Sequence, residues 1–362
     1  MGIINASAIP HDVETSKVGG REWDSLTPEE KKLSCRAMEA YAGMVDSIDV
    51  NVGKVVDYLK KSGEYDNTFI VFMSDNGAEG AALEAVPVMG DNILQAIHQY
   101  YDNSYENLGA WNSFSWLGPL WAQASTAPSR LFKCYPSEGG ILVPCVVKPP
   151  INKMPCAPPK GSLNRSFSTV MDFLPTFLDL AGISLPPASA KERSAALYDA
   201  KDVTTRKMTT FRGKDVHAVR GRSWMPYFGR GEKEEEDETW AIYSSQEPVG
   251  WELFARGALR KGEWKIVHID KKHGGVGEGD TGWELFNIAR DPGETEDLAR
   301  AEPEKYKELL AHWDEYVVDC GIVWGDFASA PGFRKDEAPD YWQDELELQS
   351  SWMVAKGGET VQ

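Results

Sequence analysis

Only two segments between Met1 and Gly182 have the pattern of buried β-strands, and this limits what the chain can fold into. Residues 69–73 (FIVFM) and 141–147 (ILVPCVV) are apolar and rich in β-branched side chains. Such runs are typical of strands buried in a parallel sheet, with Pro144 marking an edge or a bulge. Because a doubly wound sheet usually has about five or more strands, two strands cannot form its core. We therefore expect a missing partner segment, placed before residue 1.

The composition is that of a folded, acidic chain. With 38 Lys+Arg against 56 Asp+Glu in 362 residues, the formal net charge is −18. We expect no nucleic-acid partner, because non-specific nucleic-acid binding depends on clustered basic side chains. No apolar run approaches the ~20 residues of a membrane span, and no signal-peptide core follows Met1. We therefore expect a soluble protein with no membrane partner, cytoplasmic by default.

The chain contains none of the common catalytic or metal-binding motifs considered below, so they do not indicate its function. Its five cysteines are scattered without a zinc or disulfide spacing, and its six histidines show no HxxxH or HExxH pair. There is no G-x-S-x-G elbow and no P-loop. The chemistry must therefore come from less common local motifs.

A long amphipathic helix is predicted before the first strand. Thr27 is a good N-cap for it, and Glu30 can complete a capping box around Pro28. Gly63 is a natural C-terminal stop. Between these ends apolar residues recur at helical spacing, namely Tyr41, Met44, Val45, Ile48, Val52, Val55, Val56 and Leu59.

Asp75 and Asn76 directly follow the first predicted strand, within the tetrapeptide SDNG at residues 74–77. Open α/β sheets place their ligands at this end of the strands. A carboxylate beside an amide carbonyl offers two hard oxygen ligands, which suit Ca²⁺ or Mg²⁺. A tight turn accounts for the same residue types, and two oxygens fall short of the ~6–8 that Ca²⁺ takes. The dipeptide alone leaves both interpretations open.

Lys133 is a second candidate, in the segment APSRLFK at residues 127–133. A fixed ammonium group would attract an anionic substrate or stabilise negative charge that develops on it. Taken alone, Lys133 is better explained as an ordinary surface lysine, and Arg130 has the same ambiguity.

The second half of the chain predicts a small antiparallel sheet with one helix on a face. Residues 184–238 are polar, and the acidic run at 232–238 has the composition of a solvated loop. Short strands are expected beyond it, at 240–244, 257–260, 264–269 and 283–288. A helix is expected near residues 304–318.

Several motifs, in order, resemble the sulfatase family. The helix, strand and SDNG turn of residues 44–77 resemble one unit of that family, and residues 138–144 (EGGILVP) resemble its GGIRVP strand, with Leu142 where Arg is usual. Residues 171–182 (MDFLPTFLDLAG) resemble its DLLPTLLDLAG helix. The WELF, RDPGE and DLA motifs within residues 283–299 resemble its C-terminal signature. Residues 127–133 point more narrowly to bacterial-type arylsulfatases, and the resemblance covers roughly residues 20–320.

This resemblance implies an α/β fold with an alkaline-phosphatase-like sheet sandwich, incomplete here, and a small C-terminal α+β domain. We expect the C-terminal part of the catalytic domain at residues 1–183, the remainder with the small domain at 184–325, and an acidic tail at 326–362. The family implies hydrolysis of small-molecule sulfate esters by a formylglycine hydrate beside Ca²⁺. By that resemblance Asp75 and Asn76 are two of the Ca²⁺ ligands, and Lys133 contacts the sulfate.

The resemblance lacks the nucleophile of the family, which comes from an N-terminal C-x-P-x-R motif. Cys35 is followed by RAM and does not fit. Cys156, in CAPPK, nearly fits, but it lies after the second predicted strand, so we reject it as the nucleophile. We therefore expect an arylsulfatase-like hydrolase chain without its formylglycine segment, which alone turns over little or no substrate. The alternatives are a non-catalytic pseudo-sulfatase interaction protein and another esterase of the alkaline-phosphatase superfamily.

Overall fold

A computed structural model describes residues 8–11, 23–80, 97, 99–151, 160–184, 208–228, 242–269 and 282–322. Cys156, the acidic run at 232–238 and the expected tail at 326–362 lie outside these residues. The larger elements of the first half are α1 (Pro28–Ser62), β1 (Ile70–Met73), α3 (Pro119–Thr126), α4 (Glu138–Ile141), β2 (Cys145–Lys148) and α5 (Phe173–Leu180). Those of the second half are β3 (Met208–Phe211), β4 (Lys214–His217), α7 (Met225–Phe228), β5 (Pro248–Leu253), β6 (Arg256–Lys261), β7 (Trp264–His268), β8 (Trp283–Asn287) and α8 (Pro303–Cys320). Short 3-10 turns occur at Trp23–Ser25, Tyr65–Asn67 and Val170–Asp172.

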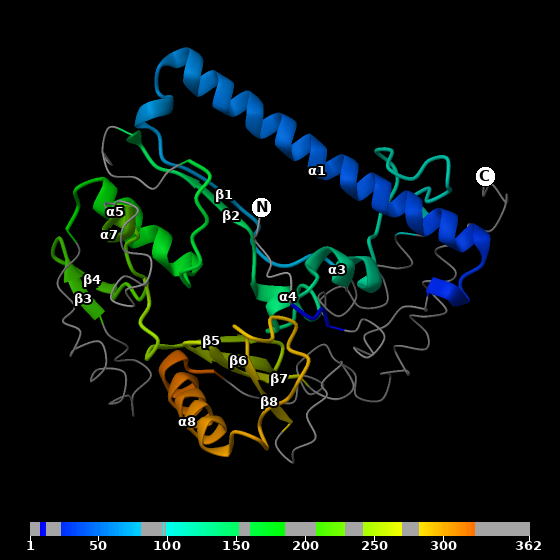
Figure 1. Ribbon diagram of the computed structural model, residues 1–362. Helices are drawn as coiled ribbons and strands as arrows, with labels where there is room; N and C mark the ends of the chain where they lie inside the picture. The colour runs from blue at the N-terminus through cyan, green and yellow to red at the C-terminus, as the bar shows by residue number, and fades with distance from the viewer. Residues whose placement is uncertain are drawn as a thin grey trace.

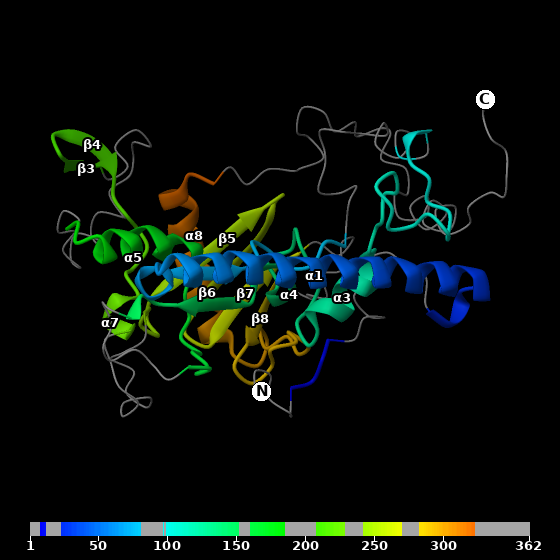
Figure 2. The same ribbon diagram turned by 90° about the horizontal axis from the view of Figure 1, so that it is seen from above.

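The predicted long helix is confirmed as α1, which crosses the whole molecule above the strands (Figures 1 and 2). The Thr27 hydroxyl accepts a hydrogen bond from Glu30 N at 3.2 Å, and Thr27 N donates to Glu30 Oε2 at 2.7 Å. This reciprocal pair is the predicted capping box. At the other end Gly63 adopts a left-handed conformation with φ of 76°, which only glycine adopts without strain.

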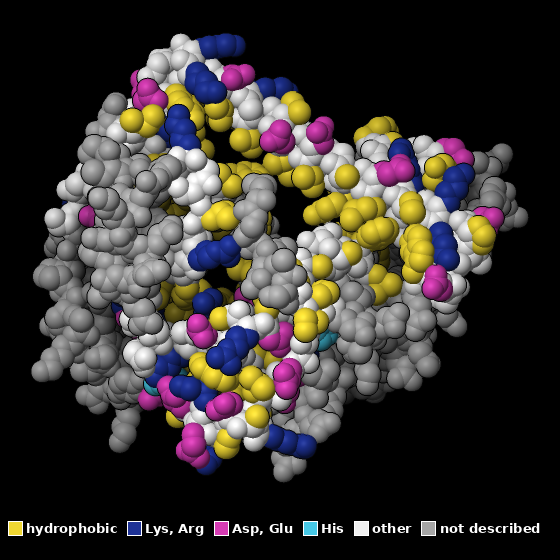
Figure 3. Space-filling view, in the orientation of Figure 1, with side chains coloured by type: hydrophobic (Ala, Val, Ile, Leu, Met, Phe, Trp, Pro, Cys, Tyr) yellow, Lys and Arg dark blue, Asp and Glu magenta, His cyan; other side chains and the backbone are white. Residues whose placement is uncertain are grey.

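Half of the apolar stripe of α1 is exposed to solvent, and the other half is only partly buried. The buried side chains lie in its first turns, where Leu33 and Ala37 pack against Leu108. Farther along, Met44 is 53% exposed and Val55 is 60% exposed. Figure 3 shows hydrophobic side chains gathered along the side of α1 that faces β1 and β2, beside an open hollow. No helix in the described part of the chain has the length and hydrophobicity needed to cross a bilayer.

Strands β1 and β2 correspond to the two predicted apolar runs, but they pair antiparallel, with Ile70 opposite Lys148. The parallel, fully buried arrangement expected for them is wrong, since Phe72 is 43% and Val146 is 63% exposed. An apolar run does not encode strand direction. The start of the second strand is also later than predicted, because residues 138–141 form the single turn α4, and the pairing begins only after Pro144.

Strands β5 to β8 form a four-stranded antiparallel sheet in sequence order, with α8 packed on one face (Figure 1). This confirms the predicted sheet and helix. Alternation along the strands separates two cores. The core beneath α8 contains Leu259, Ile266, Trp283, Leu285, Leu309 and Trp313. The core on the opposite face contains Ala258, Val267, Ile269 and Phe286 together with Ala122, Leu131, Phe132 and Tyr135 from the first half of the chain.

Three elements in this region differ from the prediction. Strand β5 was not predicted, because Pro248 and Gly250 interrupt its pattern. The hairpin of β3 and β4 lies in the stretch expected to be polar and without strands. Residues 242–244, part of the strand expected at 240–244, are not in a strand.

Candidate functional site

The turn after β1 is fastened to residues 133–144 by three backbone hydrogen bonds. They run from Ser74 N to Pro144 O (3.3 Å), from Gly77 N to Gly140 O (3.0 Å) and from Lys133 N to Ala78 O (3.0 Å). The predicted candidate residues Asp75, Asn76 and Lys133 therefore lie on two segments that are joined directly. Two segments that are far apart in sequence thus form one small surface at the end of β1.

Glycine makes this close approach possible. A Cβ added to Gly77 would lie 1.8 Å from the Gly139 carbonyl oxygen, and one added to Gly139 would lie 2.1 Å from Leu131 O. One added to Gly140 would lie 2.1 Å from Tyr135 O. Because all three contacts are with backbone atoms, no side-chain movement can relieve them. The EGG motif and the SDNG turn are thus packed backbone to backbone.

Asp75 and Asn76 lie in a bend, so the turn interpretation of SDNG is correct as local structure. The Ser74 hydroxyl donates to the Asn76 carbonyl oxygen at 2.7 Å, which closes the bend. Asp75 is exposed and Asn76 is half-buried. The turn therefore leaves the Asp75 carboxylate accessible from outside.

Lys133 forms an ion pair that the sequence did not indicate. Its Nζ lies 2.6 Å from Glu79 Oε2, and the two side chains are 37% and 42% exposed. The hydrogen bond with Glu79 raises the pKa of Lys133 above its usual range, and the charge of Asp75 contributes in the same direction. Lys133 is thus a cation paired with Glu79 at the edge of the turn. Glu79 follows SDNG by only two residues, and this proximity is the sequence feature from which its part in the site could have been predicted.

The donor chemistry of the turn fits a hard cation, but the set of ligands is incomplete. Asp75 and Asn76 supply a carboxylate and an amide oxygen, which Ca²⁺ accepts. No group of three or more His, Cys, Asp or Glu side chains suited to a metal occurs among the residues that the structure describes. Further ligands for a Ca²⁺ ion would have to come from elsewhere.

Arg130 is not a surface residue. Its side chain is completely buried, and Nη1 lies 2.8 Å from Glu284 Oε2, which is also completely buried. Of the two basic candidates in residues 127–133, the structure therefore leaves Lys133 at the surface of the site and places Arg130 beneath it.

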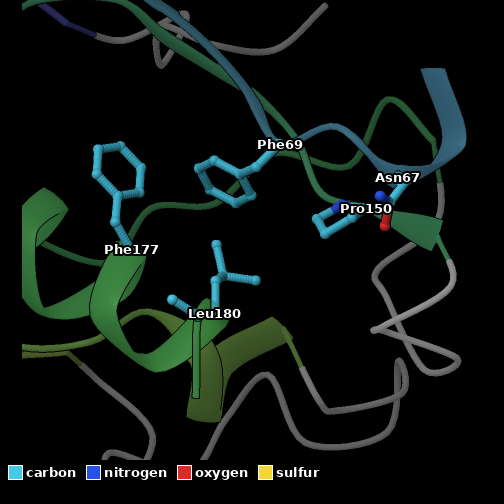
Figure 4. A pocket seen from close by; sticks show the side chains of 6 residues that line it. Asn67, Phe69, Pro150, Phe177 and Leu180 are labelled. Carbon is cyan, nitrogen blue, oxygen red and sulfur yellow. The ribbon is translucent and has the colours of Figure 1, made fainter. Parts of the chain in front are cut away.

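An apolar pocket of about 350 Å³ lies at the opposite end of β1, away from the turn (Figure 4). Its walls come from the residues just before β1, from the residues just after β2, and from the end of α5. Asn67 contributes a polar side chain, and the other described lining residues are Phe69, Pro150, Phe177, Leu180 and Ala181. The rings of Phe69 and Phe177 meet edge to face, with centroids 5.8 Å apart. None of the candidate residues lines this pocket, so it is separate from the site.

Comparison with known proteins gives a consistent group of relatives. The Sulfatase family model matches residues 9–183. An uncharacterized sulfatase of Schizosaccharomyces pombe is 41% identical over 324 residues, which are 89% of this chain and 50% of that protein. An arylsulfatase of Klebsiella aerogenes is 33% identical over 198 residues, which are 53% of this chain and 39% of that protein. The crystal structure of Ps i-CgsB in complex with k-i-k-neocarrahexaose covers 96% of this chain and 55% of its own, with a TM-score of 0.47 and 20% identity.

The chain therefore spans half the length of the first of these curated relatives and less of the second. The family match includes the strand-end turn, Lys133 and α5, and it ends before β3.

Proposed function

We propose that this chain, which belongs to the sulfatase family, forms part of an arylsulfatase-type sulfuric-ester hydrolase that acts on aryl or alkyl sulfate esters and uses Ca²⁺. The observation that carries the proposal is the joining of Lys133 to the SDNG turn. One ammonium group and two oxygen-bearing side chains, Asp75 and Asn76, share one surface there. A site for a sulfate in an acidic chain needs such a local source of positive charge.

The chemistry assigned to this surface is charge stabilisation. Hydrolysis of a sulfate ester breaks an S–O bond, water supplies the new oxygen, and the alcohol or phenol leaves with a proton. The Lys133 ammonium would bind a sulfate oxygen and offset its charge while the bond breaks. Glu79 now holds this ammonium at 2.6 Å, so the sulfate must share Lys133 with Glu79 or displace it. Asp75 and Asn76 would hold Ca²⁺, which would supply a second positive charge when bound.

We propose further that polypeptide outside these 362 residues completes the catalytic domain. In support, half of the apolar stripe of α1 is exposed and none of it is fully buried, and Phe72 of β1 and Val146 of β2 are exposed. Among the described residues β1 and β2 pair with each other alone. Exposed apolar surfaces of this extent mark places that another segment covers. Additional strands beside β1 or β2 would cover them and would bring the nucleophile toward Lys133.

Hydrolysis of p-nitrophenyl sulfate, with and without Ca²⁺, tests the proposal. We expect little or no turnover from the 362-residue protein. We expect Ca²⁺-dependent turnover from a longer chain that adds the in-frame sequence upstream of Met1. Robust turnover by the protein that begins at Met1 would overturn the claim that it is incomplete. A longer chain that hydrolyses p-nitrophenyl phosphate but not the sulfate would overturn the assignment to sulfate esters.

Matched lysine variants of the longer chain test the role of Lys133. Lys133→Met should reduce turnover of p-nitrophenyl sulfate by a factor of about 100, the scale of losing one preorganised charge-stabilising group. Lys307→Met is the control, because Lys307 is 70% exposed on α8 and pairs with an exposed glutamate, Glu304. Equal activity of the two variants would contradict the assigned role of Lys133.

A further inference from the structure

Five buried charged side chains lie beneath the candidate site, and we call them the bridging cluster: Arg130, Glu138, Lys265, Glu284 and Glu294. Glu138 is 7% exposed and the other four are completely buried. Lys265 Nζ lies 2.6 Å from Glu138 Oε1 and 2.9 Å from Glu294 Oε1. The Arg130–Glu284 pair described above completes the cluster.

The bridging cluster joins the site-bearing segment to the C-terminal sheet. Arg130 and Glu138 flank Lys133 in the first half of the chain. Lys265 lies on β7, Glu284 on β8 and Glu294 in the turn that follows β8. The contacts between the two halves of the chain therefore link residues 127 to 156 positions apart in sequence.

Backbone hydrogen bonds carry this connection to the site. The carboxylate of Glu294 accepts a hydrogen bond from Glu138 N at 2.9 Å, which holds the first residue of α4. The carbonyl oxygen of Arg130 accepts one from Gly139 N at 2.9 Å. Gly139 and Gly140 are the residues against which Gly77 packs. A displacement of the cluster would therefore also displace the turn that bears Asp75.

The buried charges fix the relative positions of the two segments that they join. Two cations face three carboxylates in a region without solvent, where each charge is costly unless its partners are in place. Complete burial raises the pKa of Glu294 above its ordinary value, against the opposing effect of Lys265. An apolar contact tolerates sliding, whereas ion pairs of 2.6–2.9 Å do not. The surrounding apolar core, which includes Phe132 and Phe286, holds the parts together, and the charges fix their register.

We infer that the bridging cluster positions the Lys133-bearing loop and the strand-end turn, so that the C-terminal sheet is a working part of the candidate site. The inference rests on the proposed function only for the role of Lys133. The five residues are positioning residues, since they lie beneath the site and act through the backbone of residues 130–140.

Amide hydrogen exchange on the full chain tests this inference, resolved to single residues. The reporters are the amides of Gly77, Lys133 and Gly139, whose hydrogen bonds define the site. The reference is the set of amides in the middle of α8. In Lys265→Met we expect exchange at the three reporters to accelerate at least thirtyfold, because one partner of a buried pair is lost. Exchange in α8 should accelerate less than threefold.

Lys261→Met is the matched control. Lys261 is in the same sheet and is also ion-paired, with its Nζ 2.7 Å from Glu308 of α8, but it is not in the bridging cluster. We expect this variant to affect α8 more than the three reporters. Equal acceleration of reporters and α8 in Lys265→Met would show a general loss of stability and would overturn the inference. Unchanged reporters would overturn it as well.

The titration of the Lys133 ammonium gives a second readout that a general structural role would not move. The hydrogen bond with Glu79 is the main cause of its raised pKa, so we expect NMR titration to show a lower pKa in Lys265→Met and no change in Lys261→Met. If Lys265→Met does not fold, the exchange measurement is made on Glu284→Gln instead. The new amide oxygen at position 284 can still accept a hydrogen bond from Arg130, so this variant is a milder change. In Glu284→Gln, a three- to tenfold acceleration of exchange that is confined to the reporter amides supports the inference. Unchanged exchange at the reporter amides overturns it. These measurements need no sulfate ester, so their outcome is separate from that of the hydrolysis assay.

Discussion

Replacing Gly77 with alanine should destabilise the protein through one identified contact. The added Cβ would lie 1.8 Å from Gly139 O and 3.0 Å from Gly140 Cα. Since a carbon and a carbonyl oxygen need about 3 Å, the two segments would have to separate by roughly 1.2 Å, beyond what side-chain rotation can absorb. The 3.0 Å hydrogen bond from Gly77 N to Gly140 O would then exceed the usual range.

The expected loss follows from these two effects. Forced separation in a well-packed region costs about 1–3 kcal/mol, and each hydrogen bond lost adds about 0.5–1.5 kcal/mol. The bond from Lys133 N to Ala78 O lies beside the clash and would be strained with it. We therefore expect Gly77→Ala to lower the free energy of unfolding by about 2–5 kcal/mol.

Urea unfolding followed by tryptophan fluorescence measures this loss, with Gly53→Ala as the matched control. Gly53 lies within α1, and a Cβ added there meets nothing within 4 Å. Alanine in a helix interior is favoured over glycine by about 1 kcal/mol, so the same chemical change should stabilise the protein at this position. A Gly77→Ala protein whose stability stays within about 0.5 kcal/mol of the wild type, the usual range of a neutral surface substitution, would refute the packing argument.

Two charge changes give opposite dependences on pH. Glu79→Gln should lower the pKa of Lys133 toward 10.5, as NMR titration would measure. The stability that the pair adds, at most about 1 kcal/mol for side chains this exposed, is present below that pH and lost as pH rises through the folded pKa. Glu308 accepts hydrogen bonds from Lys261 and Lys305, which lower its pKa to about 2. Glu308→Gln should therefore cost about 0.5–1 kcal/mol at pH 7, and this difference from the wild type, measured by urea unfolding, should disappear as pH falls from 4.5 to 2. A difference that persists at pH 2 would contradict this assignment.

The sequence predicted best those elements whose determinants are local. The ends of α1 depend on Thr27, Glu30 and Gly63, which lie at or beside the helix ends, and all were predicted. The resemblance to the sulfatase family followed from ordered motifs, and the Sulfatase family model matches residues 9–183. The sheet of β6 to β8 and α8 followed from apolar spacing.

Long-range features were not predictable from one sequence. The direction of β2 relative to β1 depends on the long connection between Met73 and Cys145, and the apolar pattern is the same for either direction. Arg130 and Lys265 have the composition of surface residues, yet their partners lie 154 and 127 positions away in sequence. A charged residue at an inward position of an apolar strand, as in WKIVH at 264–268 and WELF at 283–286, was the available signal.

For the candidate site, the sequence located Asp75, Asn76 and Lys133 through motif resemblance, and the structure adds Glu79 and the glycine packing. Their roles toward Ca²⁺ and sulfate stay predictions. Spacing did not indicate that residues 75 and 133 would be neighbours, because only the folded backbone brings them together.

The bridging cluster also sets the order in which the site can assemble during synthesis. Arg130 is translated 154 residues before its partner Glu284, and at about 5–20 residues per second that interval lasts roughly 8–30 s. Throughout it, Arg130 lacks its partner Glu284, and the β8 side chains that enclose the loop bearing Lys133 are absent. The site is therefore among the last parts of the described chain to form on the ribosome. A pause in translation between residues 140 and 294 would prolong the exposure of Leu131 and Phe132 more than that of α1.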